Sequence, residues 1–536
     1  MTEKVFVPSF IAKMVKVFKV ENSLETAVAE DDSKIRVNQA IGRVSLIYEK
    51  LRNVVDYNDE HLIRKNAIFR IMKRLISIEG RVDGLGLHLI QDLIRINHLP
   101  NNTILESSAH GLDRLLEKYL TIEKFIDKYY KGRFARRLFI WFLQIAACEV
   151  EDYLFDFRER QASIIAMTKV LKRDIELPSG VNEKNQDILF NLTALKSFFK
   201  SDEGILHYYL LSQFYPNFFG SDPNLQDVER LVQNWNVEQS RMEKYLSHPL
   251  RNKLNKIGRR YAVYFLILRE VLAKNRDRIE DIVTHPRVLT EEVATVCSQR
   301  YKEIRIKVVR SVVRSVIYIF ITKMVLAMLL EIPFEYFLQQ GLNYSSILIN
   351  VLFPPVLMLA ISLLIRLPKQ KNTEKIIHEI KDIVYQKEGT EQKKYHIRHG
   401  LGRGTITRFF FNIIYLITYG ITFGVVIWFL NKIHFNILSG GIFIFFLCIV
   451  SFFAINIRLR ARELIVLDNR EGFINLLFDF FSLPIVRLGR WLSVKLSKIN
   501  VFVFIMDFII EAPLKIILEV LEDWFSFMRE KKEEIY

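Results

Sequence analysis

The sequence is poor in cysteine, with only three among its 536 residues. Cys148, Cys297 and Cys448 lie far apart, and no Cys-x-x-Cys pair or Cys/His cluster accompanies them. A disulfide framework and a structural zinc site both need such groupings, so neither is predicted. No cofactor is expected, and a reducing compartment suits the soluble part of the chain.

Motifs that carry catalysis are also missing. The chain has no phosphate-binding loop with a Walker lysine, no Gly-x-Ser-x-Gly elbow, no kinase signature and no His-Glu-x-x-His. Glu149, Asp152 and Asp156 share one face of a predicted helix, but no Glu-x-x-His follows to complete a carboxylate-bridged metal site. We interpret them as a solvated acidic face that pairs with Arg158 and Arg160. The sequence therefore favours a protein that is not an enzyme.

Residues 1–20 lack the features of a secretory signal, because lysines divide the apolar positions and no small-residue cleavage site follows. A helix starting at Ser9 would place its apolar residues on one face, and these are Phe10, Ile11, Met14, Val17 and Phe18. Such a basic amphipathic helix would lie either on an anionic membrane surface or on the protein's own surface. A mitochondrial presequence fits less well, since the stretch contains no arginine.

Residues 21–312 show little of the alternation that is typical of strands. Apolar residues recur instead every three or four positions, and clusters of Gly, Pro and Asn interrupt the pattern. This region is predicted to be an all-helical soluble domain that is large enough to bury a core of its own.

Charged residues are absent from three long apolar runs, which are residues 345–365, 409–431 and 435–457. Each run reaches the roughly 20 residues that a helix needs to cross a ~30 Å hydrocarbon core. A further candidate span at about 315–332 has Lys323 near its middle and Glu331 at its end. Its apolar residues favour insertion by about 3–6 kcal/mol against about 3 kcal/mol for one central lysine. The sequence therefore predicts an all-α chain with a four-helix transmembrane bundle at residues 313–457.

Lysine and arginine are distributed unevenly around these spans. They are dense before the first span, in the loop at residues 366–408 and just after residue 457, whereas residues 333–344 contain none. Because positively charged loops stay on the cytoplasmic side, both termini and the helical domain are predicted to be cytoplasmic. A bacterial plasma membrane is favoured over organelle membranes.

Polar residues and glycines in and beside the spans are the candidate sites. An ionisable group in a membrane is a functional candidate, so Lys323, Glu331 and Glu335 form a candidate intramembrane polar site. The alternative for Lys323 is that it snorkels or faces a polar neighbour within the bundle. Four glycines are candidates for close helix packing, and these are Gly420, Gly424, Gly440 and Gly441.

The net charge of +16 fits an anionic partner. With spans present, a bilayer with anionic headgroups is a more economical partner than nucleic acid. Residues 458–536 are predicted to form an amphipathic, interfacial segment. Within it, residues 499–521 carry a charge every four positions, which suits a helix lying in the interface; packing against the spans is the alternative. The candidate contacts to anionic lipid are Arg398, His399, Arg403, Arg408, Arg487, Arg490, Lys495 and Lys498.

These features favour an integral membrane protein without catalytic activity, a scaffold that presents a cytoplasmic helical domain to a protein partner. A channel or transporter, with Lys323 and Glu331 or Glu335 along its path, is the alternative. A lipid-handling enzyme at the membrane interface is a second alternative. The motifs indicate no family that would choose among the three, and they do not indicate an oligomeric state.

Overall fold

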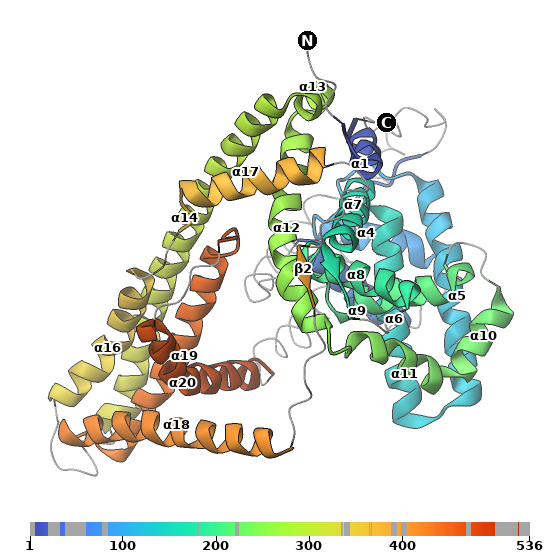
Figure 1. The fold of residues 1–536 in the computed structure, drawn as a ribbon. Coiled ribbons are helices and arrows are strands. Elements are labelled where there is room, and N and C mark those ends of the chain that lie inside the picture. Colours follow the sequence, from blue (N-terminus) through green and yellow to red (C-terminus); the bar gives the residue numbers. More distant parts are fainter. Residues whose placement is uncertain are drawn as a thin grey trace, which may run out of the picture. The chain divides into compact units, whose positions relative to one another are not determined.

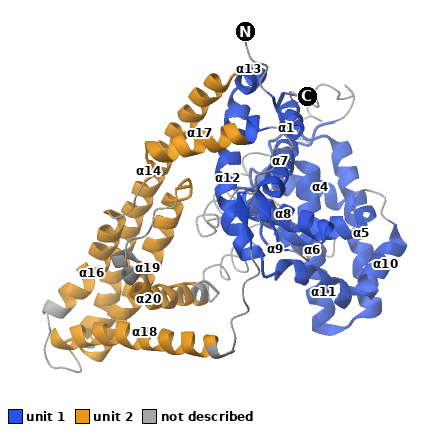
Figure 2. Ribbon diagram, viewed as in Figure 1, with its two compact units in different colours: residues 1–284, 383–399, 502–536 blue, residues 285–382, 400–501 orange. Residues whose placement is uncertain are grey.

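A computed structural model shows that the described chain is almost entirely helical, as the sequence predicts. The structure describes residues 6–19, 33–37, 60–77, 84–178, 182–219, 224–333, 336, 344–363, 365, 367–386, 394–397, 405–467, 473–498 and 524. The chain divides into two compact units (Figure 2). Unit 1 comprises residues 1–284, 383–399 and 502–536, and unit 2 comprises residues 285–382 and 400–501.

Unit 1 is built from short and medium-length helices (Figure 1). Its α-helices are α1 (Ser9–Lys19), α3 (Glu60–Ser77), α4 (Leu85–Arg95), α5 (Glu106–Tyr129), α6 (Gly132–Leu154), α7 (Arg158–Asp174), α8 (Glu183–Ser197), α9 (Glu203–Phe214), α10 (Leu225–Gln233), α11 (Trp235–Leu246), α12 (Arg251–Lys274) and α13 (Ile279–Thr284). Two 3₁₀ turns lie between helices, η2 (Pro216–Phe218) between α9 and α10 and η3 (Arg276–Arg278) between α12 and α13. A two-residue parallel pair, β1 (Ile175–Glu176) and β2 (Tyr395–His396), ties the later segment of the unit to the end of α7.

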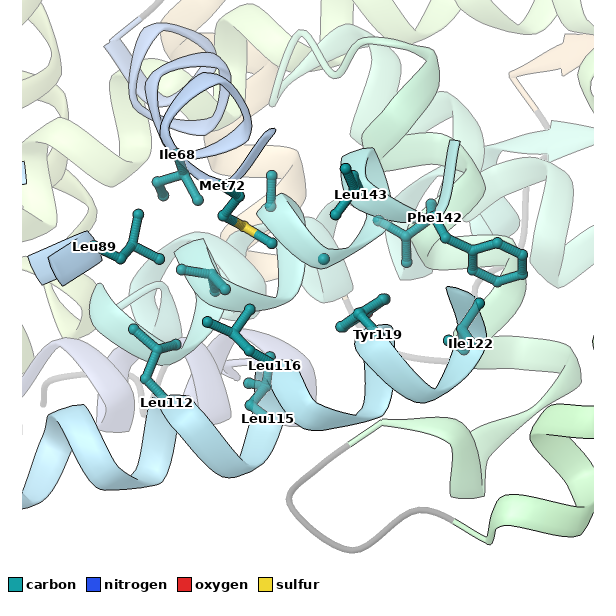
Figure 3. Packing of buried hydrophobic residues seen from close by; sticks show 14 of the residues in the cluster. Ile68, Met72, Leu89, Leu112, Leu115, Leu116, Tyr119, Ile122, Phe142 and Leu143 are labelled. Carbon is teal, nitrogen blue, oxygen red and sulfur yellow. The ribbon is translucent and has the colours of Figure 1, made fainter. Parts of the chain in front are cut away.

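The core of unit 1 follows from the helical spacing of its apolar residues. Along α5, buried side chains recur every three or four positions, because that spacing places them on one face. Figure 3 shows Met72 of α3, Leu89 of α4, Leu116 of α5 and Phe142 of α6 meeting in one cluster. Each such side chain contributes about 1.5–3 kcal/mol when it is fully buried, so this interior is the main source of the unit's stability.

The N-terminal helix forms where the sequence predicts it, and it packs against the protein itself rather than lying free for a membrane surface. Ile11, Met14 and Phe18 of α1 are buried within unit 1, and α7 lies against the helix. The lysines lie off this face, and Lys19 forms an ion pair with Glu280 at 2.7 Å.

Unit 2 consists of longer and more apolar helices. They are α14 (Pro286–Leu326), the π-helical turn η4 (Ala327–Glu331), α16 (Tyr344–Leu363), α17 (Gln370–Tyr385, which the division between the units cuts after Asp382), α18 (Thr405–Lys432), α19 (Ile437–Ala461) and α20 (Phe473–Lys498). Three helical segments of the described chain are long and apolar enough to cross a membrane, and these are Pro286–Glu331, Phe409–Lys432 and Ile437–Ala461. A shorter apolar helix spans Ile347–Leu363. This is the composition of a membrane protein.

Three of these helices pack on one another. α14, α16 and α19 are in mutual contact, and Ile319, Met358 and Val450 belong to the buried cluster between them. α18 contacts α20 and α19, and in Figure 1 α18 and α20 run across the direction of α14 and α16. Most large apolar side chains of α18 are exposed within the chain, including Phe409, Leu416 and Trp428.

A buried asparagine fastens the N-terminal end of α17 to its neighbours in unit 2. Asn372 Nδ2 donates to the carbonyl oxygen of Leu464 at 2.8 Å and to Tyr301 Oη at 2.9 Å. Its Oδ1 accepts from the backbone N–H of Val466 at 2.9 Å. One side chain therefore links α14, α17 and the segment after α19.

The beginning of unit 2 differs in position from the boundary that the sequence suggests at residues 312–313. Residues 286–326 form one continuous helix, so the basic stretch before the first apolar run belongs to the same helix as that run. The proposed interfacial helix at residues 499–521 lies outside the described residues.

Candidate functional site in the apolar bundle

Two members of the predicted intramembrane polar site meet at the end of α14. Lys323 lies on the last turns of α14, and Glu331 ends the π-helical turn η4. Eight residues rise about 12 Å along an α-helix, and a π-helical turn rotates the residues that follow it around the axis. With two long side chains bridging the remaining gap, Lys323 Nζ lies 2.6 Å from Glu331 Oε1. Glu335, the third predicted member, lies outside the described residues.

This ion pair is closed off from the surroundings of the chain. Both side chains have an exposed fraction of 0%. The ammonium group also lies 4.8 Å from the centre of the Phe446 ring on α19, a favourable distance for a cation–π contact. Each charge is neutralised by the other, which offsets the large cost of placing either one alone in an apolar interior.

Two further polar side chains are buried in the same helices. Asn350 of α16 donates through Nδ2 to the backbone oxygen of Ser439 on α19 at 3.2 Å. Asn350 Oδ1, Ser439 Oγ and Glu331 Oε2 are all buried, and none of these three atoms has a hydrogen-bond partner within the described chain. We call Glu331, Asn350 and Ser439 the polar layer.

The register between the helices places the three residues at one level. Along α14, Val312 and Ile319 share a cluster with Val450 and Ile457 of α19, whereas Lys323 contacts Phe446, earlier in α19. The two helices therefore run antiparallel, and residues beyond Lys323 lie opposite the first turns of α19. Ser439 lies in the first turn of α19, and its backbone oxygen accepts from Asn350.

Sequence reasoning missed Asn350 and Ser439. The signal was present for Asn350, the one amide side chain within residues 345–365. A buried amide in an apolar span is costly unless it is hydrogen-bonded, and it therefore indicates a polar neighbour on another helix.

The candidate lipid contacts are only partly described. Arg487, Arg490 and Lys495 are exposed on α20. Arg487 donates to Tyr415 Oη of α18 at 2.8 Å and stacks on the same ring. Arg408 and Lys498 lie on helices, but their side chains are not described; Arg398, His399 and Arg403 lie outside the described residues.

The candidate packing glycines have few or no atoms of the described chain close to them. A Cβ atom at Gly420, Gly424 or Gly441 would meet no heavy atom within 4 Å, and one at Gly440 would meet only Leu430 at 3.9 Å. Close packing at these positions stays a prediction. A glycine that was not predicted, Gly489 of α20, lies so close to α19 that a Cβ atom would overlap the Cys448 carbonyl.

The acidic face predicted on α6 is only partly solvated. Asp156 is exposed and pairs with Arg158 at 2.7 Å, as predicted. The interpretation of Glu149 is wrong, because its carboxylate is buried and binds Lys118 Nζ at 2.7 Å and Tyr119 Oη at 2.6 Å. Burial lowers the pKa of Lys118, and Glu149 opposes this effect. The partner of Glu149 lies 31 positions away on α5, a distance that periodicity along one helix cannot reveal.

Among the described residues, no group of three or more His, Cys, Asp or Glu side chains is placed to hold a metal ion. The chain matches no family model, no curated protein and no solved structure.

Proposed function

We propose that the chain is an integral membrane scaffold, in which unit 2 anchors the protein and unit 1 is a helical interaction domain. The observation that carries the proposal is the arrangement of charge in unit 2. Its apolar helices expose large apolar side chains, whereas Lys323 and Glu331 neutralise each other in a closed pair. A bilayer is the solvent that suits such a surface, and a closed, neutral pair suits an anchor rather than an open path for ions.

The placement of exposed basic residues supports an orientation for this anchor. Five of them precede the apolar part of α14 along the same helix, and these are Lys302, Arg305, Lys307, Arg310 and Arg314. Such residues favour the cytoplasmic leaflet and its anionic headgroups. In the proposed arrangement α14, α16 and α19 cross the bilayer as one packed group, and α18, which runs across them in Figure 1, turns on insertion to become the fourth span. Both termini are cytoplasmic, and Arg487, Arg490 and Lys495 contact headgroups beside an interfacial α20.

The proposal is tested with the intact protein in two assays. Reconstituted in liposomes, the wild-type chain is expected to conduct no more ions than empty liposomes do. Purified in mild detergent, it is expected to retain a protein partner that is lost when exposed residues of unit 1 are substituted. Ion flux that depends on Lys323 would contradict the scaffold.

The polar layer favours a second candidate, a channel or transporter. Three buried oxygens, on η4, α16 and α19, have no hydrogen-bond partner among the described residues, and such polar groups are the kind that lines an ion or water path. In that case Asn350→Leu would reduce flux through reconstituted protein while leaving the fold intact. Equal, background-level flux in the wild type and the variant would leave the scaffold as the only candidate of the two.

A further inference from the structure

Arginine and aromatic side chains gather in unit 1 where α3, the turn between α6 and α7, and the end of α8 come together. The group consists of Arg64, Phe155, Phe157, Arg160 and Phe199. We call it the arginine–aromatic cluster. His61 of α3 adds its ring to one side, at 4.2 Å from the centre of Phe199.

The aromatic rings hold both guanidinium groups in place. Arg64 Cζ lies 4.2 Å from the centre of Phe155 and 5.9 Å from that of Phe157. Arg160 Cζ lies 5.7 Å from Phe157 and 5.0 Å from Phe199. Two cations therefore share one ring, and aromatic contacts position both guanidinium groups, whereas carboxylates of the described residues reach only Arg64.

Acceptors for these two guanidinium groups are scarce. Among the described residues no carboxylate forms an ion pair with Arg160, and its Nη1 atom is buried without a hydrogen-bond partner. Arg64 reaches Glu60 and Glu151 only at 3.4 Å each. Neighbouring arginines form closer ion pairs with carboxylates, since Arg158 pairs with Asp156 at 2.7 Å and Arg276 pairs with Glu159 at 2.6 Å.

The nearest buried carboxylate does not balance the cluster. Burial raises the pKa of Glu151 to about 7, although Arg64 opposes the shift, so this group is about half protonated near neutral pH. Burial, together with the charges of Arg269 and Arg64, lowers the pKa of Arg160. Like charges held together in a partly desolvated place repel one another, and an anion would relieve that repulsion.

We propose that the arginine–aromatic cluster is a binding site for a phosphate group, held by the guanidinium groups of Arg64 and Arg160. A guanidinium group presents parallel donors that match two oxygens of one phosphate. A phosphate has enough oxygens to bind two such groups at once, which a single carboxylate does less well. The inference rests on the proposed function, in which unit 1 is the interaction domain, and it names the chemistry that unit 1 recognises.

The test uses the full chain in detergent and inorganic phosphate as the probe, by calorimetric titration at constant ionic strength set with chloride. Arg160→Met is expected to weaken phosphate binding about tenfold or more, because a charge-assisted hydrogen bond contributes about 1.5–3 kcal/mol. Arg160→Lys keeps the positive charge but loses the two parallel donors of the guanidinium group, so it is expected to bind phosphate with intermediate affinity. Arg158→Met is the matched control and is expected to bind phosphate as the wild type does.

A second arm identifies the source of the phosphate. The titration is repeated in nanodiscs of neutral lipid and in nanodiscs that contain an anionic phospholipid. Suppressed uptake of inorganic phosphate in the anionic discs assigns the site to a lipid headgroup, and unchanged uptake assigns it to a soluble ligand. The proposal is overturned if the wild type binds no phosphate at low ionic strength, or if Arg158→Met and Arg160→Met weaken binding equally. Neither result bears on membrane anchoring, which the flux and partner assays test separately.

Discussion

A buried ion pair stabilises a structure much less than its short distance suggests, because each charge first has to leave water. Lys323 and Glu331 are of this kind, with 2.6 Å between Nζ and Oε1 and no exposed side-chain surface. Removing either member lowers the stability strongly, since the remaining charge would stay buried alone. This asymmetry is what a substitution experiment can detect.

We expect Lys323→Met to destabilise the protein by about 3–5 kcal/mol, because Glu331 would be left as an unpaired buried charge. The double variant Lys323→Met, Glu331→Leu is expected to recover most of that loss, since it contains no buried charge. The measurement is unfolding in detergent, with Lys432→Met as an exposed control that changes stability by no more than about 0.5 kcal/mol. If the losses measured for Lys323→Met and for Glu331→Leu alone simply add in the double variant, the pair is not coupled.

Glu151 gives unit 1 a predictable dependence on pH. Burial raises its pKa from 4.5 to about 7 in the folded protein. Between these values the unfolded chain gives up the proton while the folded chain keeps it, so stability falls as pH rises. The shift corresponds to a loss of about 3 kcal/mol across that interval. Burial also raises the pKa of the neighbouring Asp152 to about 6, so we expect Glu151→Gln to reduce the slope and to remove it only above about pH 6.

The measurement for Glu151 is denaturant unfolding of unit 1 between pH 5 and pH 8, a range that lies on both sides of the folded-state pKa of about 7. Trp141 reports on this unit, because it packs against Phe142 and Trp235 in the core. Fluorine-labelled tryptophan separates its signal from those of the other tryptophans. A slope of equal size in the wild type and in Glu151→Gln would assign the pH dependence to other groups.

At the scale of the element, α19 and α20 show what a single missing Cβ atom permits. A Cβ atom at Gly489 would overlap the Cys448 carbonyl and lie 2.9 Å from Phe452 Cβ. Backbone contact of this closeness needs glycine, because the obstacle is the main chain of α19 rather than a flexible side chain. α20 therefore lies along α19 with main chain against main chain.

We expect Gly489→Ala to force α20 away from α19 and to destabilise the protein by about 1–3 kcal/mol, as overpacking does. Gly441→Ala on α19 is the matched control, since a Cβ atom there meets no heavy atom of the described residues within 4 Å. The control is expected to gain up to about 1 kcal/mol from the better helix propensity of alanine. Thermal unfolding in detergent gives the comparison, and equal effects of the two substitutions would exclude close packing at Gly489.

The helices were more predictable than their contacts. α16, α18 and α19 begin and end near the limits of the charge-free runs, because composition sets how far an apolar helix can extend. The full length of α14 was not predicted, since charge changes along it without a turn signal. Lys323 and Glu331 were singled out as polar residues, but a separation of eight positions does not imply contact on a regular helix. Arg64 and Arg160 meet only through tertiary packing, which one sequence does not reveal.

At the scale of the whole molecule, the proposal requires that every basic segment outside the apolar helices of unit 2 lies on one side of the membrane. Lys302 on α14 and Lys371 on α17 are exposed positions on two such segments. Lys432 is the last residue of α18, next to the short connection to α19, and the proposal places it on the opposite side. The alternation follows from the positive-inside rule, so it is a statement about the chain's insertion rather than its packing.

Single cysteines test this arrangement with little background, because Cys148, Cys297 and Cys448 are all buried. We expect Lys432→Cys to react with a membrane-impermeant maleimide added outside intact cells. Lys302→Cys and Lys371→Cys are expected to react only after the membrane is opened, since both lie on the side of the basic segments. Labelling of the positions 302 and 371 from opposite sides would require an odd number of spans between them. In that case α14 and α16 could not both be spans that cross the membrane in succession. The four-span anchor on which the proposed function depends would then be wrong.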